Sequence, residues 1–214
     1  MPKTSSAPCI VKLFCPTLHP WYIIRKRPMS QSASSLLPPL SNQDWPDALT
    51  DMQDGFSGQL NVYRVMAHHP ALVRAWADLR QHIVIDTSLG RQMSEVVILR
   101  AATHLKSSYE WDSHVVRART LGLTDARISS LKGDAANMEP NDAILVRAVD
   151  DLTQNARIQP ETLSALIALV GHQGTLDLIA TLGFYSTLGF ILNTFNVPLD
   201  AEIAAELTAS PLTP

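Results

Sequence analysis

Apolar positions follow a helical period through most of the chain from residue 44 onward. Between Pro70 and about Ile85, one stripe of a helix collects the apolar side chains Leu72, Ala75, Trp76, Leu79 and Ile83. No stretch of comparable length alternates apolar and polar residues as a half-buried strand would. The pattern therefore predicts an all-α fold, a multihelical bundle.

Prolines, glycines and cap residues divide this part of the chain into separate helices. Pro140 and Pro160 stand at first-turn positions, and Gly122 and Gly171 follow helix ends. Helices are predicted over about 45–58, 61–69, 70–85, 89–105, 108–121, 124–131, 140–155 and 160–171, followed by a long apolar helix that ends near residue 196.

Two of the predicted helices carry unusually many apolar residues. The helix over 89–105 is apolar almost all round, which is typical of the centre of a bundle. Leu176 to Phe195 approaches the length of a membrane span, but polar residues such as Asp177 and Asn193 interrupt it. A buried helix of a soluble bundle is the better interpretation, and no membrane partner is expected.

The first 43 residues differ from the rest in charge and composition. No acidic residue precedes Asp44, and five basic residues fall in this stretch, so the remainder has a net charge of −8 against −3 for the whole chain. We interpret residues 1–43 as a disordered basic extension and residues 44–208 as the helical domain. Two alternatives remain for residues 1–28: translation begins at Met29, or these residues are a transit peptide. Without a transit peptide, the protein is expected in the cytoplasm.

Composition narrows the classes of partner and of chemistry. Charged residues make up 17% of the chain, below the roughly 25% of typical domains, which indicates crowded packing or apolar surface covered by another subunit. The negative net charge argues against a nucleic-acid partner. Cys9 and Cys15 both precede the helical domain, which excludes disulfides, cysteine-ligated metals and dithiol chemistry there.

Glu95 is a carboxylate in the helix that is apolar on nearly every side. Burial would disfavour its charged form unless a cation or hydrogen-bond donors compensate. Pairing with Arg91 or Arg100 would make it a structural acid, and a functional acid is the alternative.

Glu110 and His114 are four residues apart on the next predicted helix and so share one face. A glutamate beside a histidine raises the pKa of the imidazole and suits it to acid–base work near neutral pH. Arg117 continues the same stripe, so a solvated face is the competing interpretation. A zinc site would need a third ligand, and His104 lies beyond a predicted helix break, so no metal is expected.

Several segments around these residues resemble one known family. Glu95 to Arg100 and Ser107 to His114 are similar to the central helix pair of the carboxymuconolactone decarboxylase family, which includes the alkylhydroperoxidase-D-like proteins. The flanking segments 61–70, 118–125 and 192–199 agree with the resemblance, which covers most of residues 44–200.

The resemblance implies different chemistry for the two branches of the family. In the peroxidase branch a Cys-x-x-Cys motif occupies the positions of Ser107 and Glu110, so thiol peroxidase or peroxiredoxin-like activity is disfavoured here. The decarboxylase branch has a Glu, an aromatic residue and a His at the positions of Glu110, Trp111 and His114, and this chain retains them. Ser107 stands where that branch tends to have histidine, which puts the lactone substrate itself in doubt.

By resemblance we expect a cofactor-free homo-oligomer, a trimer or hexamer, acting on a small carboxylated lactone or carbonyl substrate. His114 would donate a proton to the substrate carbon, with Glu110 orienting its ring and Glu95 relaying protons; Ser107, Tyr109 and Trp111 would contact the substrate. The alternative is a non-catalytic helical subunit that kept the fold. An enclosed pocket shared by the three acid–base residues would favour the enzyme.

Overall fold

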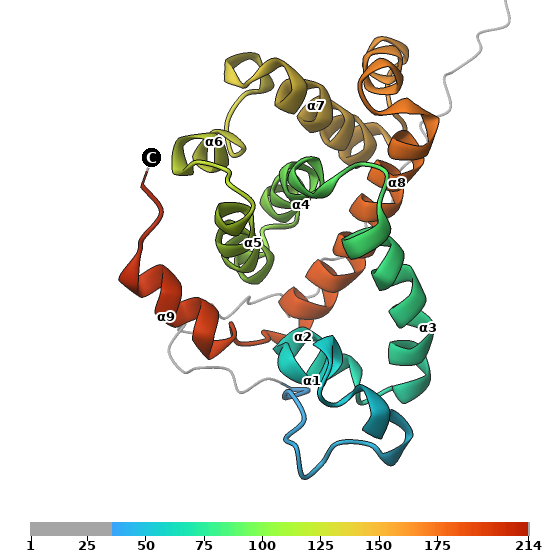
Figure 1. The fold of residues 1–214 in the computed structure, drawn as a ribbon, viewed down its shortest axis with the longest axis vertical. Coiled ribbons are helices and arrows are strands. Elements are labelled where there is room, and N and C mark those ends of the chain that lie inside the picture. The colour runs from blue at the N-terminus through green and yellow to red at the C-terminus, as the bar shows by residue number, and fades with distance from the viewer. Residues whose placement is uncertain (1–35, 214) are drawn as a thin grey trace, which may run out of the picture. The chain divides into compact units, whose positions relative to one another are not determined.

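The computed structural model describes residues 36–213, which belong to one compact unit spanning 33–214, and these residues form helices and loops without a strand (Figure 1). The predicted all-α fold is confirmed. The helical elements are η1 (Asp47–Met52), α1 (Phe56–Gln59), α2 (Asn61–Met66), α3 (Pro70–Gln81), η2 (His82–Asp86), α4 (Arg91–Leu105), α5 (Ser108–Thr120), α6 (Asp125–Ser130), η3 (Ala135–Asn137), α7 (Pro140–Asn155), α8 (Pro160–Phe195) and α9 (Ala201–Ala209).

Helix α4 forms the centre of the fold. It packs against α5, α7 and α8 (Figure 1), and its Val96, Val97 and Leu99 side chains are completely buried. Burial of each such side chain stabilises the fold by roughly 1.5–3 kcal/mol. The expectation that this apolar helix occupies the core is therefore correct.

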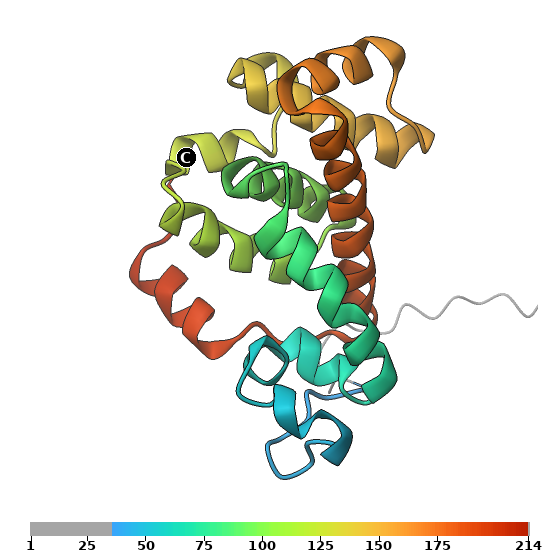
Figure 2. The same cartoon turned by 45° about the vertical axis from the view of Figure 1, so that its right-hand side comes forward.

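Helix α8 runs along α4 and continues to the end of the molecule formed by α1 and α2 (Figure 2). Gly171 interrupts it with φ 71° and ψ −179°, a conformation open to glycine, so the predicted break at this residue is a kink between two helical stretches. Among the described residues, α8 alone is long and apolar enough to cross a membrane. Half of its most apolar window is buried inside the protein, as expected for a core helix.

A second apolar cluster joins α2, the C-terminal half of α8 and the helices around them. Trp76 on α3 stacks on Phe184 of α8 at 4.5 Å between ring centroids, and Val62, Tyr63 and Leu188 are buried in the same cluster. This cluster fixes the position of α2 and α3 relative to α8, and these three elements form one side of the cavity described below.

The helix predicted over 70–85 is α-helical only as far as Gln81, and the turn that follows it, η2, is π-helical. Asp177 of α8 holds the adjoining loop, because its carboxylate accepts hydrogen bonds from His82 Nε2 at 2.8 Å, Thr87 Oγ1 at 3.2 Å and the Ser88 backbone N–H at 2.6 Å. A contact between residues about 90 positions apart leaves no local signal in the sequence.

The two ends of the described chain extend beyond the predicted bounds of 44 and 208. Leu37 and Leu40 pack against the second cluster, and Arg64 donates a hydrogen bond to the Leu40 carbonyl. Helix α9, which was not predicted, contacts α5. Cys9, Cys15 and the interpretations of residues 1–28 lie outside the described residues.

Candidate active site

Helices α4 and α5 place three ionisable side chains in the protein interior. Glu95 on α4 is 2% exposed, and Glu110 and His114 on α5 are 3% and 4% exposed. Helix α5 begins where the Ser107 side chain accepts a hydrogen bond from the Glu110 backbone N–H at 3.4 Å. The i, i+4 spacing then puts Glu110 and His114 on one face, as predicted.

Each nitrogen of the His114 ring faces a carboxylate. Nδ1 donates a hydrogen bond to Glu95 Oε2 at 2.6 Å, and Nε2 lies 3.4 Å from Glu110 Oε2. Glu95 has a second cationic neighbour, because Arg117 Nε lies 3.4 Å from its Oε1. Neither Arg91 nor Arg100 pairs with Glu95; Arg100 binds Asp150 through two hydrogen bonds instead.

This arrangement favours the protonated imidazole. Burial by itself would lower the pKa of His114, but the charge of Glu95 and hydrogen bonds to Glu110 and Glu95 outweigh it and raise the pKa above its ordinary value. Only a doubly protonated ring can donate towards both carboxylates. The imidazolium, a competent proton donor, therefore persists to higher pH here than in an ordinary histidine.

A cavity of about 210 Å³ opens beside this cluster. Its walls are mainly apolar and aromatic, and Glu110 and His114 form part of them. The complete lining comes from α2, α3, α5, α8 and α9 with the residues next to them: Leu60, Val62, Tyr63, Arg80, Val84, Tyr109, Glu110, Ser113, His114, Arg117, Tyr185, Leu188 and Ile203.

Three polar atoms of the cavity lining are buried without a hydrogen-bond partner. They are Glu110 Oε1, Ser113 Oγ and Arg80 Nε. A buried polar atom without a partner costs roughly 1–3 kcal/mol, so such atoms are uncommon and need an explanation. A bound molecule with complementary donors and acceptors would satisfy all three.

Tyrosines add hydroxyl groups to the same cavity. Burial raises the pKa of Tyr63 to about 12 and the pKa of Tyr185 well above its ordinary value, so both phenols stay protonated. The Tyr185 ring meets the His114 ring edge to face, with centroids 4.9 Å apart. Tyr109 is already engaged, because its hydroxyl donates to Asp200.

The residues predicted to contact substrate separate into two places. Tyr109 lines the cavity, whereas Ser107 and Trp111 line a different depression with Lys106 and Lys132. The helical period explains the separation, since positions 107 and 111 form one stripe of α5 and positions 110, 114 and 117 form its neighbour. Ser107 acts as the helix cap, and Trp111 is a core residue under Lys132.

Sequence reasoning did not assign to the site five lining residues that carry polar groups. Arg117 was noted on the Glu110 stripe but was interpreted as the sign of a solvated face, and Ser113 could have been found at i+3 from Glu110. Tyr63, Arg80 and Tyr185 come from α2, α3 and α8, and nothing in the local sequence connects them with α5.

Histidine and acidic residues elsewhere do not gather into a metal-binding group in the described part of the chain. His104, the third ligand considered from the sequence, instead donates to Asp150 at 2.6 Å, beside Arg100.

Solved structures with the same fold have low sequence identity to this chain. The debrominase Bmp8, as a variant in complex with 2,3,4-tribromopyrrole, has a TM-score of 0.69 and 13% identity, covering 84% of this chain and 99% of that one. An uncharacterized peroxidase-related protein from Silicibacter sp. TM1040 has a TM-score of 0.67 and 14% identity, and the match covers 82% of this chain and 96% of that one. A third match is an uncharacterized peroxidase-related protein with an alkylhydroperoxidase AhpD core, from Ralstonia eutropha JMP134. Its TM-score is 0.64 at 14% identity, and the match covers 78% of this chain and 94% of that one.

These matches define the class of the protein as an alkylhydroperoxidase-D-like helical fold. Residues 70–154, which include Glu95, Glu110 and His114, match the model of the carboxymuconolactone decarboxylase family. The central helices therefore match that family, as the sequence resemblance predicted. None of the curated proteins compared with it matches the sequence.

Proposed function

We propose that this protein is an acid–base enzyme that transfers a proton to carbon, in the manner of a decarboxylase, on a small carboxylated lactone or carbonyl substrate. The observation that carries the proposal is the His114 ring held between two carboxylates at the wall of a cavity of about 210 Å³. The residues that line the cavity include no cysteine, so the proposed step is assigned to acid–base groups.

The proposed reaction exchanges one carboxylate for one proton. The bond to the leaving carboxylate breaks, carbon dioxide departs, and the electron pair passes into the conjugated carbonyl to give an enolate. Protonated tyrosine hydroxyls of the cavity, Tyr63 and Tyr185, stabilise the enolate oxygen. His114 then gives a proton to the carbon and regains one from water, so atoms and charge balance.

For the two carboxylates we propose roles that differ from those predicted from the sequence. Glu95 makes the short contact with Nδ1 and is also near Arg117, which suits it to orient the ring. Glu110 stands beside Nε2 with its other oxygen unpartnered, which suits it to exchange protons with the substrate.

Two further observations support an enzyme over a non-catalytic subunit. A subunit that lost its chemistry would leave Glu110 and His114 solvated, or paired without space beside them, whereas both line the cavity; Glu95, the third predicted acid–base residue, contacts His114 but is not part of the lining. The cavity also has the size for a single small ring, and a structural neighbour is in complex with a small halogenated ring.

The test is turnover of carboxylated lactones, with carboxymuconolactone as the first compound and carbon dioxide release as the readout. His114→Ala should lower kcat/KM by about 10² or more, the usual contribution of general acid catalysis. His172→Ala is the matched control, because His172 is exposed on α8 and outside the cavity. Normal turnover by His114→Ala would refute the proposal.

A further inference from the structure

Arg80 is the cation of the cavity that lacks a carboxylate partner. Its Nε is buried without a hydrogen-bond acceptor, and the ion pairs of the described residues all involve other basic side chains. Arg117, the other arginine in the lining, is within ion-pair distance of Glu95. Arg80 is therefore the group in the cavity with a positive charge still to be matched.

Aromatic contacts hold the Arg80 guanidinium in place before any ligand arrives. Its Cζ lies 4.1 Å from the ring centroid of Phe56 on α1 and 6.0 Å from that of Tyr63 on α2. Phe56 and Tyr63 also pack edge to face, with centroids 4.8 Å apart. A stacked guanidinium keeps its fork of donors fixed in direction, which suits it to bind a carboxylate with two parallel hydrogen bonds.

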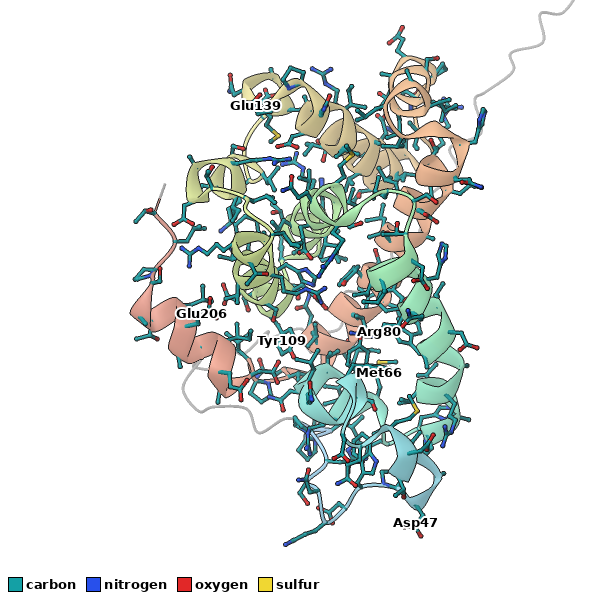
Figure 3. All side chains as sticks on the ribbon, in the orientation of Figure 1. Asp47, Met66, Arg80, Tyr109, Glu139 and Glu206 are labelled. Carbon is teal, nitrogen blue, oxygen red and sulfur yellow. The ribbon has the colours of Figure 1, made fainter. Side chains whose placement is uncertain are left out.

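The remaining cavity lining is complementary to the rest of such a ligand. Apolar and aromatic side chains, among them Val62, Leu188 and Ile203, line the space between polar groups contributed by different helices. Figure 3 labels Arg80 on α3 and Tyr109 on α5, two contributors to this lining. Glu110 Oε1, an acceptor without a partner, is available to a hydrogen-bond donor of the ligand.

We infer that Arg80 is the residue that selects the substrate, by binding a carboxylate carried on a small planar unsaturated ring. This inference rests on the proposed function, since it places the bound molecule in the same cavity as His114. The carboxylate at Arg80 is an anchor: a guanidinium stabilises the charged group and would oppose its loss, so the reaction takes place at the part of the ring nearer His114.

The test compares two ring compounds of nearly equal shape and different charge, sodium benzoate and benzamide, by isothermal titration at constant ionic strength. The wild-type protein should prefer benzoate by about tenfold or more, since one compound satisfies the guanidinium with a charge-assisted pair and the other does not. Arg80→Met should abolish the preference, and Arg80→Lys should retain part of it. Arg147→Met is the control, because Arg147 is exposed on α7 outside the cavity.

Retained benzamide binding by Arg80→Met would show that the variant is folded. Equal binding of the two compounds by the wild type, an unchanged preference in Arg80→Met, or no binding of either compound would each overturn the inference. The proposed function fails by a different result, normal turnover in His114→Ala, which leaves the benzoate preference intact. The two failures are therefore distinguishable.

Discussion

Two carboxylates flank the His114 ring, and they differ in what else they contact. Glu95 is held by His114 and lies near Arg117, so both of its oxygens face cations. Glu110 faces His114 with one oxygen and has no partner for the other. At the scale of single residues, Glu95 is held in place, whereas one oxygen of Glu110 is available to a ligand. We therefore assign the orientation of the His114 ring to Glu95 and proton exchange to Glu110.

The pH dependence of turnover follows from the protonation of His114. Because the neighbouring carboxylates raise its pKa, the donor form persists to higher pH than in an ordinary histidine and is lost as the pH rises through that raised pKa. We expect kcat/KM to fall on the alkaline side, and Glu95→Gln to move this fall to lower pH because it removes a charge that favours the imidazolium. Rates measured between pH 5 and 10 in both proteins test this; an alkaline limb unmoved in Glu95→Gln would contradict it.

At the scale of elements, the approach of α1 to the preceding turn depends on a glycine. A Cβ on Gly58 would lie 1.8 Å from the Gln53 carbonyl oxygen, a backbone atom that cannot swing aside. Gly58→Ala should therefore lower the free energy of unfolding by about 1–3 kcal/mol through backbone displacement. It should also weaken benzoate binding, since α1 carries Phe56 beneath Arg80.

Gly183 on α8 is the matched control for this prediction. It is exposed, and within one copy of the chain a Cβ there would meet nothing within 4 Å. Because Gly183 lies on the same stripe of α8 as Ile179 and Phe190, both variants are compared in a Phe190→Asp background. Gly183→Ala should raise the free energy of unfolding by about 0.5–1 kcal/mol, the gain expected when alanine replaces glycine inside a helix. Urea denaturation of both variants gives the comparison, and equal effects would show that the close approach of Gly58 to Gln53 is not significant.

The link between η2 and α8 depends on Asp177. Burial would raise the pKa of Asp177, but hydrogen bonds from His82 and the Ser88 N–H together lower it below the ordinary value. Because the pKa is lower in the folded protein, this group stabilises the fold above the ordinary aspartate pKa and ceases to do so as the pH falls through the lowered value.

Asp177→Asn should accordingly lower the free energy of unfolding at pH 7 by roughly 1–3 kcal/mol, and the loss should shrink as the pH approaches 3. Urea denaturation at several pH values measures this. A loss of equal size at every pH would contradict the assigned role of the carboxylate.

At the scale of the whole molecule, the sequence predicted the fold better than it predicted the site. Helical period, prolines and the cap at Ser107 are local signals, so most helices and the central position of α4 could be predicted. The change to a π-helical turn at His82, the helix α9 and the cavity residues Arg80 and Tyr185 depend on contacts between distant segments. Glu110 and His114 could be found from the sequence because residues four positions apart on one helix lie on the same face.

Exposed apolar side chains gather on one surface of α8. Leu176, Ile179 and Phe190 are 66%, 42% and 61% exposed, and the helical period places them on one stripe. We propose that a second copy of the chain covers this stripe in a homo-oligomer, in keeping with the low charged fraction of the sequence.

Phe190→Asp should shift the molecular mass measured by light scattering from an oligomer to a monomer, because it places a charge in an apolar contact. Thr120→Asp, an exposed position at the end of α5, is the control and should leave the mass unchanged. A monomeric wild-type protein would refute the proposal.

The central claim is that His114 is an imidazolium held between two carboxylates, and NMR titration of its ring tests this most directly. The pKa of His114 in the wild type should lie above 6.5, and Glu95→Gln and Glu110→Gln should each lower it. A His114 pKa at or below 6.5 that neither substitution moves would show that the ring is not coupled to the carboxylates, and the acid–base function would lose its basis.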